Sequence, residues 1–220
     1  INTADNSKYI AEFTKNCEFA VDLGITTIRV DTVQPPTIFA EVDYATAKKR
    51  LVDTWNVCAD IAATYGLSVT WEGEPGFAFN KPSEIVEILE AIQKPNFGFL
   101  YDTCHAQIIS VMGTRQNGEK EVFECQTEFL KMVGPRINHV HLIDSDNTCH
   151  QENGVDETSA HPPFGLGLLD FDKIVPAILE YYPADGWWTN DLCFWDNAWE
   201  ATETCIKFMN ELNKKYQVEV

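Results

Sequence analysis

The sequence predicts an α/β protein built on a parallel sheet, and three observations support that prediction. An amphipathic helix, a turn that usually carries a glycine and a short apolar strand follow one another repeatedly along the 220 residues. Strands that are separated by helices cannot pair as hairpins, so they form a parallel sheet with the helices outside it. Every predicted strand also ends in polar side chains, and no glycine-rich nucleotide-binding loop follows any strand.

The first two units lie in the amino-terminal third of the chain. Residues 7–23 have apolar side chains at helical spacing, and Gly24 separates them from the strand TTIRVDT. Residues 43–65 repeat this pattern, with Gly66 before LSVTWEGE. A glycine just past a helix is the usual left-handed cap and starts the turn into the next strand.

Three further units complete the pattern. SEIVEILEAIQ precedes the strand FGFLYDT, VFECQTEFLKMV precedes INHVHLID, and FDKIVPAILEYY precedes WWTNDLCF. A last helix, AWEATETCIKFMNELNKKY, follows these units near the end of the chain. The strand centres fall near residues 30, 71, 100, 140 and 190, which leaves room for functional loops after the strands.

Two architectures fit this order: an open doubly wound sheet and a (β/α)8 TIM barrel. The polar residues at the strand ends are Asp31, Glu72 and Glu74, Asp102 and His105, His141 and Asp144, and Asp191. A barrel explains all of them, because its active site lies at the carboxyl ends of the strands. A barrel needs eight strands and five are visible. We therefore expect residues 1–220 to be a single, N-terminally truncated domain that holds the C-terminal five βα units, with a shorter open sheet as the alternative.

The composition excludes several classes of partner. The net charge of −18 disfavours nucleic acid, because contact with phosphates needs a basic face. No run of about 18 apolar residues occurs, so we expect no membrane-spanning helix. The seven cysteines are odd in number and irregularly spaced, which favours reduced thiols in a cytoplasmic protein over a disulfide framework. A homo-oligomer is compatible with the sequence.

Carboxylates and imidazoles gather at the same end of four successive predicted strands. Residues i and i+2 of a strand face the same side, so Glu72 shares a face with Glu74, and His139 shares one with His141. A single such residue is more often a turn cap or a hydrogen-bonded core group. Burying several carboxylates together, however, costs several kcal/mol unless a cation compensates them. The joint pattern therefore predicts one divalent metal ion.

Five segments carry a more specific resemblance: VTWEGEPG, FGFLYDTCH, INHVHLIDSD, HPPFGLGLLDF and WWTNDLCF. In these the chain resembles the xylose isomerase-like TIM-barrel superfamily, the sugar (phosphate) isomerase/epimerase group that also includes endonuclease-IV-type proteins. The resemblance implies that the five strands are the fourth to eighth of the barrel. It also implies a role in carbohydrate metabolism.

Carried over by motif, the resemblance implies the metal ligands Glu74, Asp102, His141 and Asp191. Manganese is the first expectation for the ion, with magnesium, cobalt or zinc as alternatives. Glu74 is preferred to Glu72 because it directly precedes the loop, in an EP context that the family often has. Glu72, His139 and Asp144 are then expected to support the ligands by hydrogen bonds. The chain departs from the family pattern at Asp191, where Glu is commoner, and at Ile143, where Lys is usual.

The resemblance implies a sugar isomerase or epimerase that removes a proton next to a carbonyl through a metal-stabilised enediolate. Glu74 and Asp191 would act as base and acid, and His105 would hold a substrate oxygen. His161, in a Pro/Gly-rich loop, is expected to reach the substrate, as are Phe77 and Trp195, which follow strands. A metal-dependent dehydratase of a cyclitol or keto-acid is the alternative, since it begins with the same proton removal. A truncated, non-catalytic barrel is a further alternative.

Overall fold

A computed structural model of the chain describes residues 2–183 and 186–217. Five parallel strands form one sheet in the order β1-β2-β3-β4-β7. Their bounds are Thr27–Val30 (β1), Ser68–Glu72 (β2), Phe97–Asp102 (β3), Ile137–Leu142 (β4) and Trp188–Asn190 (β7). A second sheet is an antiparallel hairpin of β5 (Cys149–Glu152) and β6 (Val155–Ser159), inserted between β4 and β7.

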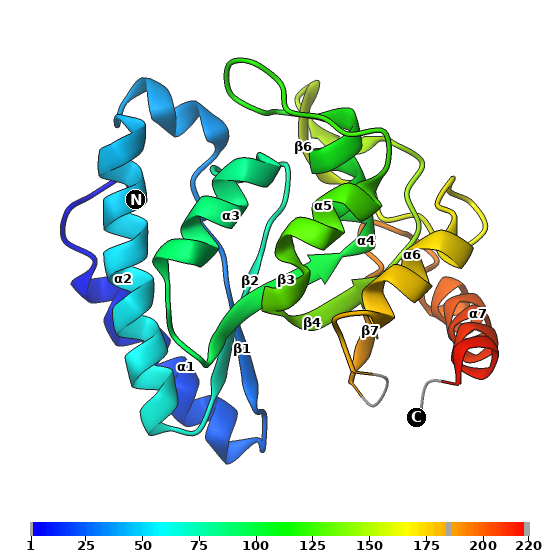
Figure 1. Ribbon diagram of the computed structural model, residues 1–220, viewed down its shortest axis with the longest axis horizontal. Coiled ribbons are helices and arrows are strands. Elements are labelled where there is room, and N and C mark those ends of the chain that lie inside the picture. Colours follow the sequence, from blue (N-terminus) through cyan, green and yellow to red (C-terminus); the bar gives the residue numbers. More distant parts are fainter. Residues whose placement is uncertain (1, 184–185, 218–220) are drawn as a thin grey trace.

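The helices alternate with the strands along the chain (Figure 1). The α-helices are α1 (Ser7–Asp22), α2 (Tyr44–Thr64), α3 (Pro82–Ala91), α4 (Thr103–Gln107), α5 (Gln126–Val133), α6 (Phe171–Leu179) and α7 (Ala198–Tyr216). Shorter helical turns are η1 (Pro36–Ala40), η2 (Ile108–Met112) and η3 (Gly134–Arg136). None of the described helices is both long and apolar enough to cross a membrane.

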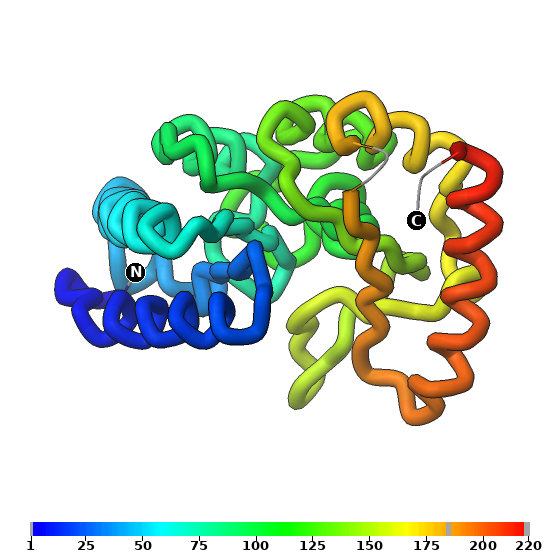
Figure 2. Tube along the Cα trace, turned by 90° about the horizontal axis from the view of Figure 1, so that it is seen from below, coloured from blue at the N-terminus to red at the C-terminus, as the bar shows by residue number. Residues whose placement is uncertain are grey.

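The sheet is curled into a half-barrel, with the long helices on its convex side. Figure 2 shows these helices following one another around an arc, from blue at the amino-terminal end to red at the carboxyl-terminal end. The hairpin, in yellow-green, lies on the other side of the sheet from α3 and α5. The predicted TIM-barrel type of fold is therefore present as five neighbouring strands of a barrel wall.

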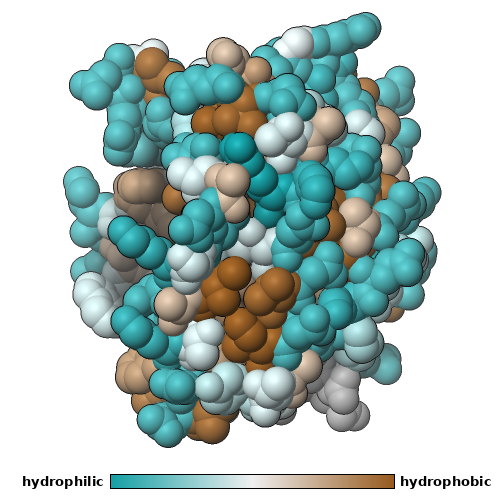
Figure 3. Space-filling model, turned by 90° about the vertical axis from the view of Figure 1, so that its left-hand side faces the viewer, coloured by the Kyte–Doolittle hydropathy of each residue, from teal (hydrophilic) through white to brown (hydrophobic). Residues whose placement is uncertain are grey.

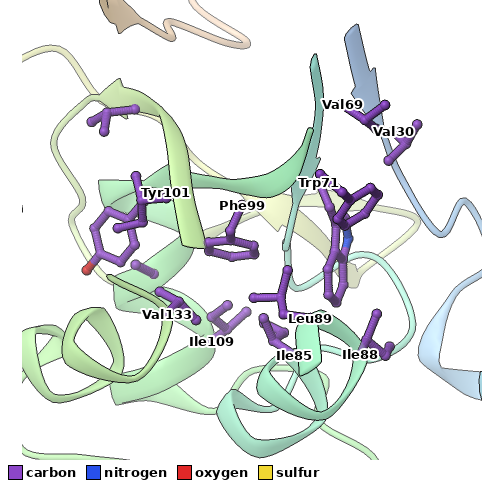
Figure 4. Packing of buried hydrophobic residues seen from close by; sticks show 14 of the residues in the cluster. Val30, Val69, Trp71, Ile85, Ile88, Leu89, Phe99, Tyr101, Ile109 and Val133 are labelled. Atoms are coloured by element: carbon purple, nitrogen blue, oxygen red, sulfur yellow. The ribbon is translucent and has the colours of Figure 1, made fainter. Parts of the chain in front are cut away.

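The core lies between the convex face of the sheet and the helices. Alternate residues of the strands point to this side, and Trp71 and Phe99 face Ile85, Ile88 and Leu89 of α3 (Figure 4). Trp71 is 1% exposed and its ring packs edge-on against Phe99, with 5.8 Å between the ring centroids. Burying a side chain of this size stabilises the fold by about 1.5–3 kcal/mol. The same alternation turns Glu72 and its counterparts toward the concave side.

β3 and β4 approach each other closely at one glycine. A Cβ atom at Gly98 would lie 2.3 Å from the side chain of Asn138 and 2.7 Å from the backbone oxygen of Arg136. The register of the two strands also shifts between Phe99 and Leu100. After this shift Asp102 pairs directly with His141, so the glycine allows the approach that brings these two side chains together.

The outer edge of β1 has no strand beside it among the described residues. A cavity of about 470 Å³ lies there between α1 and β1. Exposed apolar side chains on this side are Phe19, Val21, Leu23, Ile25 and Val33. Figure 3 faces this end of the molecule and shows brown, hydrophobic areas within a mostly hydrophilic surface.

Candidate metal centre

Four neighbouring strands bring one polar side chain each to the concave side of the sheet. Glu72 is the last residue of β2, Asp102 is the last of β3, His141 lies near the end of β4, and Asp191 directly follows β7. One donor atom from each of the four lies within 4.8 Å of the others. We call these four residues the ligand cluster.

His141 stands at the middle of the ligand cluster. Its Nδ1 lies 3.0 Å from Glu72 Oε1, 3.5 Å from Asp191 Oδ2 and 3.6 Å from Asp102 Oδ2. Burial by itself lowers the pKa of His141, but the neighbouring carboxylates of Asp102, Asp191 and Glu72 outweigh it and raise the pKa to about 12. The surrounding negative charge therefore attracts a positive charge strongly.

Several polar atoms of the site are buried without a hydrogen-bond partner among the described residues. They include Asp102 Oδ2, His141 Nδ1 and His161 Nε2. Leaving a buried polar atom unsatisfied costs about 1–3 kcal/mol, and more when the group is charged. Three carboxylates and one imidazole are a donor set that divalent ions such as Mn²⁺ or Zn²⁺ accept, so the residues present fit a bound cation.

His161 lies against two members of the ligand cluster. Its ring is buried, with Nδ1 3.4 Å from Asp191 Oδ2 and Nε2 3.9 Å from Asp102 Oδ1. Burial by itself lowers the pKa of His161, but the charge of Asp102 and the hydrogen bond to Asp191 raise it well above the usual value. Trp195 Nε1 donates a hydrogen bond of 2.6 Å to the His161 carbonyl. The structure therefore brings His161 to the site, and Trp195 next to His161.

His105 also reaches the site. It lies in α4, where Asp102 caps the first turn by accepting hydrogen bonds of 2.8 Å from the N–H groups of Cys104 and His105. The His105 ring shares a 2.9 Å hydrogen bond between Nδ1 and Ser159 Oγ. One donor atom each from His105, Asp102 and His161 lie within 4.8 Å of one another.

The structure does not bring Glu74 into the ligand cluster. Glu74 is 8% exposed and accepts a hydrogen bond from Thr158 Oγ1 of the hairpin. Glu72 therefore takes the place in the ligand cluster that was expected for Glu74, because β2 ends at Glu72 and the alternation of a strand no longer applies beyond it. Phe77 is half-buried in the turn that follows, where its N–H donates to the Glu74 carbonyl.

Asp144 and His139, which were expected to support the ligands by hydrogen bonds, bind other groups instead. Asp144 is buried and accepts hydrogen bonds from the N–H groups of Ser145, Gly165, Gly167 and Leu169. It thereby fixes the loop that carries His161.

His139 instead shares a 3.0 Å hydrogen bond with Thr189 of β7. Burial lowers the pKa of His139 to about 4, so the ring is neutral at pH 7.

The hairpin is the part of the site that sequence reasoning missed. Consecutive residues of β6 contact three separate segments of the chain: Glu157 pairs with Arg115, Thr158 binds Glu74 and Ser159 binds His105 of α4. His150 of β5 stacks on Phe194 after β7, with 4.0 Å between the ring centroids. The available signal was the pair Asn153-Gly154, where both residues have positive φ, since Asn-Gly is typical of a two-residue hairpin turn.

The family comparison covers nearly the whole chain. A family model described as "Xylose isomerase-like TIM barrel" matches residues 1–212. A curated relative, the inosose dehydratase of Yersinia enterocolitica, is 27% identical over 198 residues, which cover 82% of this chain and 62% of that protein. The chain therefore spans less than two thirds of the length of this relative.

Solved structures show the same fold. The IOLI protein with a bound zinc atom superposes with a TM-score of 0.70 at 24% identity, over 96% of this chain and 71% of that chain. A D-tagatose 3-epimerase-like protein superposes with a TM-score of 0.66 at 21% identity, over 92% of this chain and 69% of that chain. At these identities the likeness concerns the fold alone.

Proposed function

Because the chain belongs to the xylose isomerase-like TIM-barrel family, we propose that it binds one divalent metal ion and removes a proton next to a carbonyl in a sugar or cyclitol substrate. The proposed ligands are Glu72, Asp102, His141 and Asp191. The supporting observation is the convergence of these four side chains, three of which have buried donor atoms without a hydrogen-bond partner in the described part of the chain. Manganese is the ion that we put first, since oxygen donors with one imidazole suit it.

A bound cation would stabilise the negative charge that develops on substrate oxygens. Asp191 is the proposed base, because its carboxylate is the most exposed of the three, at 23% of the side chain. His161 contacts both Asp191 and Asp102, and its raised pKa favours the protonated ring, so it would act as the proton donor beside the base Asp191. His105 would hold a substrate oxygen, with its ring oriented by Ser159. Glu74 is assigned to the hairpin contact instead of to acid–base chemistry.

Two outcomes of this proton removal are proposed, in two enzyme classes. Return of the proton to a neighbouring atom or to the other face gives an isomerase or epimerase, in line with the epimerase-like structural neighbour. Loss of a hydroxyl group gives a dehydratase, and the match to an inosose dehydratase favours this second candidate. We further propose that the five strands are the fourth to eighth of an eight-stranded barrel, since the matched relatives are longer than this chain.

An exchange experiment in D₂O tests the function and separates the two outcomes. The Mn²⁺-loaded protein is incubated with a panel of ketoses, aldoses and inososes, and the products are analysed by mass spectrometry and NMR. An isomerase or epimerase should introduce deuterium at the carbon next to the carbonyl, whereas a dehydratase should form a product that has lost one water. Equal product formation by a Glu72→Gln variant would contradict the proposal.

A further inference from the structure

Arg29 lies beside the ligand cluster at the free edge of the sheet. In β1 it pairs in register with Thr70, which shares the concave face with Glu72. Its Nη1 forms an ion pair with Glu72 Oε2. Arg29 thus reaches across from β1 to the only proposed ligand that β2 supplies.

The two oxygens of Glu72 have different neighbours. Oε2 contacts Arg29, whereas Oε1 lies 3.0 Å from His141 Nδ1, inside the ligand cluster. The side chain is 1% exposed, so little room is left for the carboxylate to turn. One oxygen is therefore held by Arg29 and the other is directed toward the other ligands.

Asp31 holds Arg29 from the opposite side. Its carboxylate accepts hydrogen bonds of 3.2 Å from Arg29 Nε and 3.0 Å from Arg29 Nη2. A planar guanidinium can bind one carboxylate through a fork of two N–H groups while a further N–H group binds another, which a lysine cannot do. Arg29 therefore links the carboxylates of Asp31 and Glu72 to each other.

Charge gives Arg29 a second role. The three ligand carboxylates carry one more negative charge than a divalent ion neutralises, and the guanidinium supplies a positive charge next to them. Burial opposes the charged form of Arg29, but the charges of Glu72 and Asp31 outweigh it and raise its pKa, so it stays charged.

We propose that Arg29 is a positioning residue of the metal centre. By binding Glu72 Oε2, it leaves only Glu72 Oε1 to act as a metal ligand. This inference rests on the proposed function. Since Arg29 holds one oxygen of Glu72 and the other is directed at the ligand cluster, Glu72 is less available for a substrate proton than the more exposed Asp191. Proton transfer is left to Asp191 and His161 on the other side of the ligand cluster.

Titration with Co²⁺, with no substrate present, tests this role. The visible absorption of bound Co²⁺ reports its coordination number, so it detects a change from one Glu72 oxygen to two. The variants are Arg29→Met, which keeps an unbranched apolar stem but removes the guanidinium, and Arg29→Lys, which keeps the charge. Lys94→Met is a matched control, because it removes a positive charge that pairs with Asp60 far from the ligand cluster.

We expect Arg29→Met to weaken Co²⁺ binding by roughly 10–100-fold, the usual effect of removing a partner of a ligand. The visible absorption bands of Co²⁺ bound to Arg29→Met should also weaken, because the coordination number rises when both Glu72 oxygens bind the ion. Arg29→Lys should regain most of the affinity but keep an altered spectrum, because it lacks the fork that binds Asp31 and Glu72 together. Lys94→Met should match the unaltered chain in both respects.

Two outcomes overturn the inference in distinguishable ways. An unaltered chain that binds no Co²⁺ overturns the metal centre itself, and the role of Arg29 with it. An unaltered chain that binds Co²⁺, with both Arg29 variants matching its affinity and spectrum, overturns the positioning role alone. Circular dichroism verifies folding, and if Arg29→Met does not fold, an unchanged spectrum in Arg29→Lys is sufficient to overturn the role.

Discussion

Thr158 of β6 donates a hydrogen bond to Glu74, and this contact joins the hairpin to the loop after β2. The neighbouring Ser159 makes the corresponding contact with His105 in the helix after β3. Glu74 is therefore part of the attachment of the hairpin, whereas Glu72, two residues earlier, is part of the ligand cluster. The difference between these two glutamates leads to a first prediction.

Glu72→Gln should lower the affinity for Mn²⁺ by at least about 100-fold, because loss of a ligand costs more than the 10–100-fold typical of residues behind the ligands. Glu74→Gln is the matched control. It should leave the affinity close to that of the unaltered chain, since a Gln carbonyl can still accept the Thr158 hydrogen bond. Isothermal titration calorimetry measures both. If Glu74→Gln alone lost affinity for Mn²⁺, Glu74 would be the ligand in place of Glu72, as the sequence predicts.

Removal of the metal should destabilise the fold. An ion present at about 100 times its dissociation constant adds about 2.7 kcal/mol to the free energy of unfolding. For a chain of this size that corresponds to a fall in Tm of roughly 5–11 °C when EDTA is added, measured by differential scanning fluorimetry. The Glu72→Gln variant should lack this shift. An equal shift in the variant would mean that the ion binds elsewhere.

Asp144→Ala should destabilise the protein by about 3 kcal/mol, since it leaves backbone N–H groups of Gly165, Gly167 and Leu169 without their charged acceptor. The loop that carries His161 should loosen at the same time and lower the turnover rate. Asp144→Asn should lose less, because it keeps one acceptor oxygen. Urea unfolding gives the stability. A free energy of unfolding that Asp144→Ala leaves unchanged would show that this loop is held by other contacts.

Glu84 of α3 should give a pH-dependent stability away from the ligand cluster. Burial, together with the nearby Glu121 and Glu87, raises the pKa of Glu84 above its usual value. The folded state therefore binds more protons than the unfolded state just above pH 4.5, and this group costs stability as the pH rises through its folded pKa.

Glu84→Gln should accordingly be more stable than the unaltered chain at pH 7, with the difference disappearing toward pH 4. The Gln carbonyl can still accept the hydrogen bond from the Lys81 N–H that Glu84 accepts now. Chemical denaturation at a series of pH values measures the difference. A constant difference across the series would assign it to packing instead of charge.

The periodicity of the sequence predicted the strands and the long helices well, because each strand buries one face under a helix. Trp71 and Phe99 mark that face clearly. The same alternation also predicted which strand ends carry polar groups. The predicted convergence of Asp102, His141 and Asp191 is present in the structure.

The sequence could not decide between Glu72 and Glu74, because both satisfy the i, i+2 rule. The choice depends on where β2 ends, and that is set by its pairing with β3 through Glu72 and Leu100. The hairpin was missed for a different reason. Cys149–Glu152 is polar and lies outside the core, so it has no apolar face that the periodicity could detect.

The nearest-neighbour order of the strands has a consequence for how the chain folds. The order of the strands in the sheet is the same as their order along the chain. The strands β1 to β4 can therefore assemble in turn as the chain emerges during synthesis. Asp191 follows β7, the last strand among the described residues, and it completes the ligand cluster. High-affinity binding of a cation would then be a late event of folding. It would require that β7 has already joined the sheet.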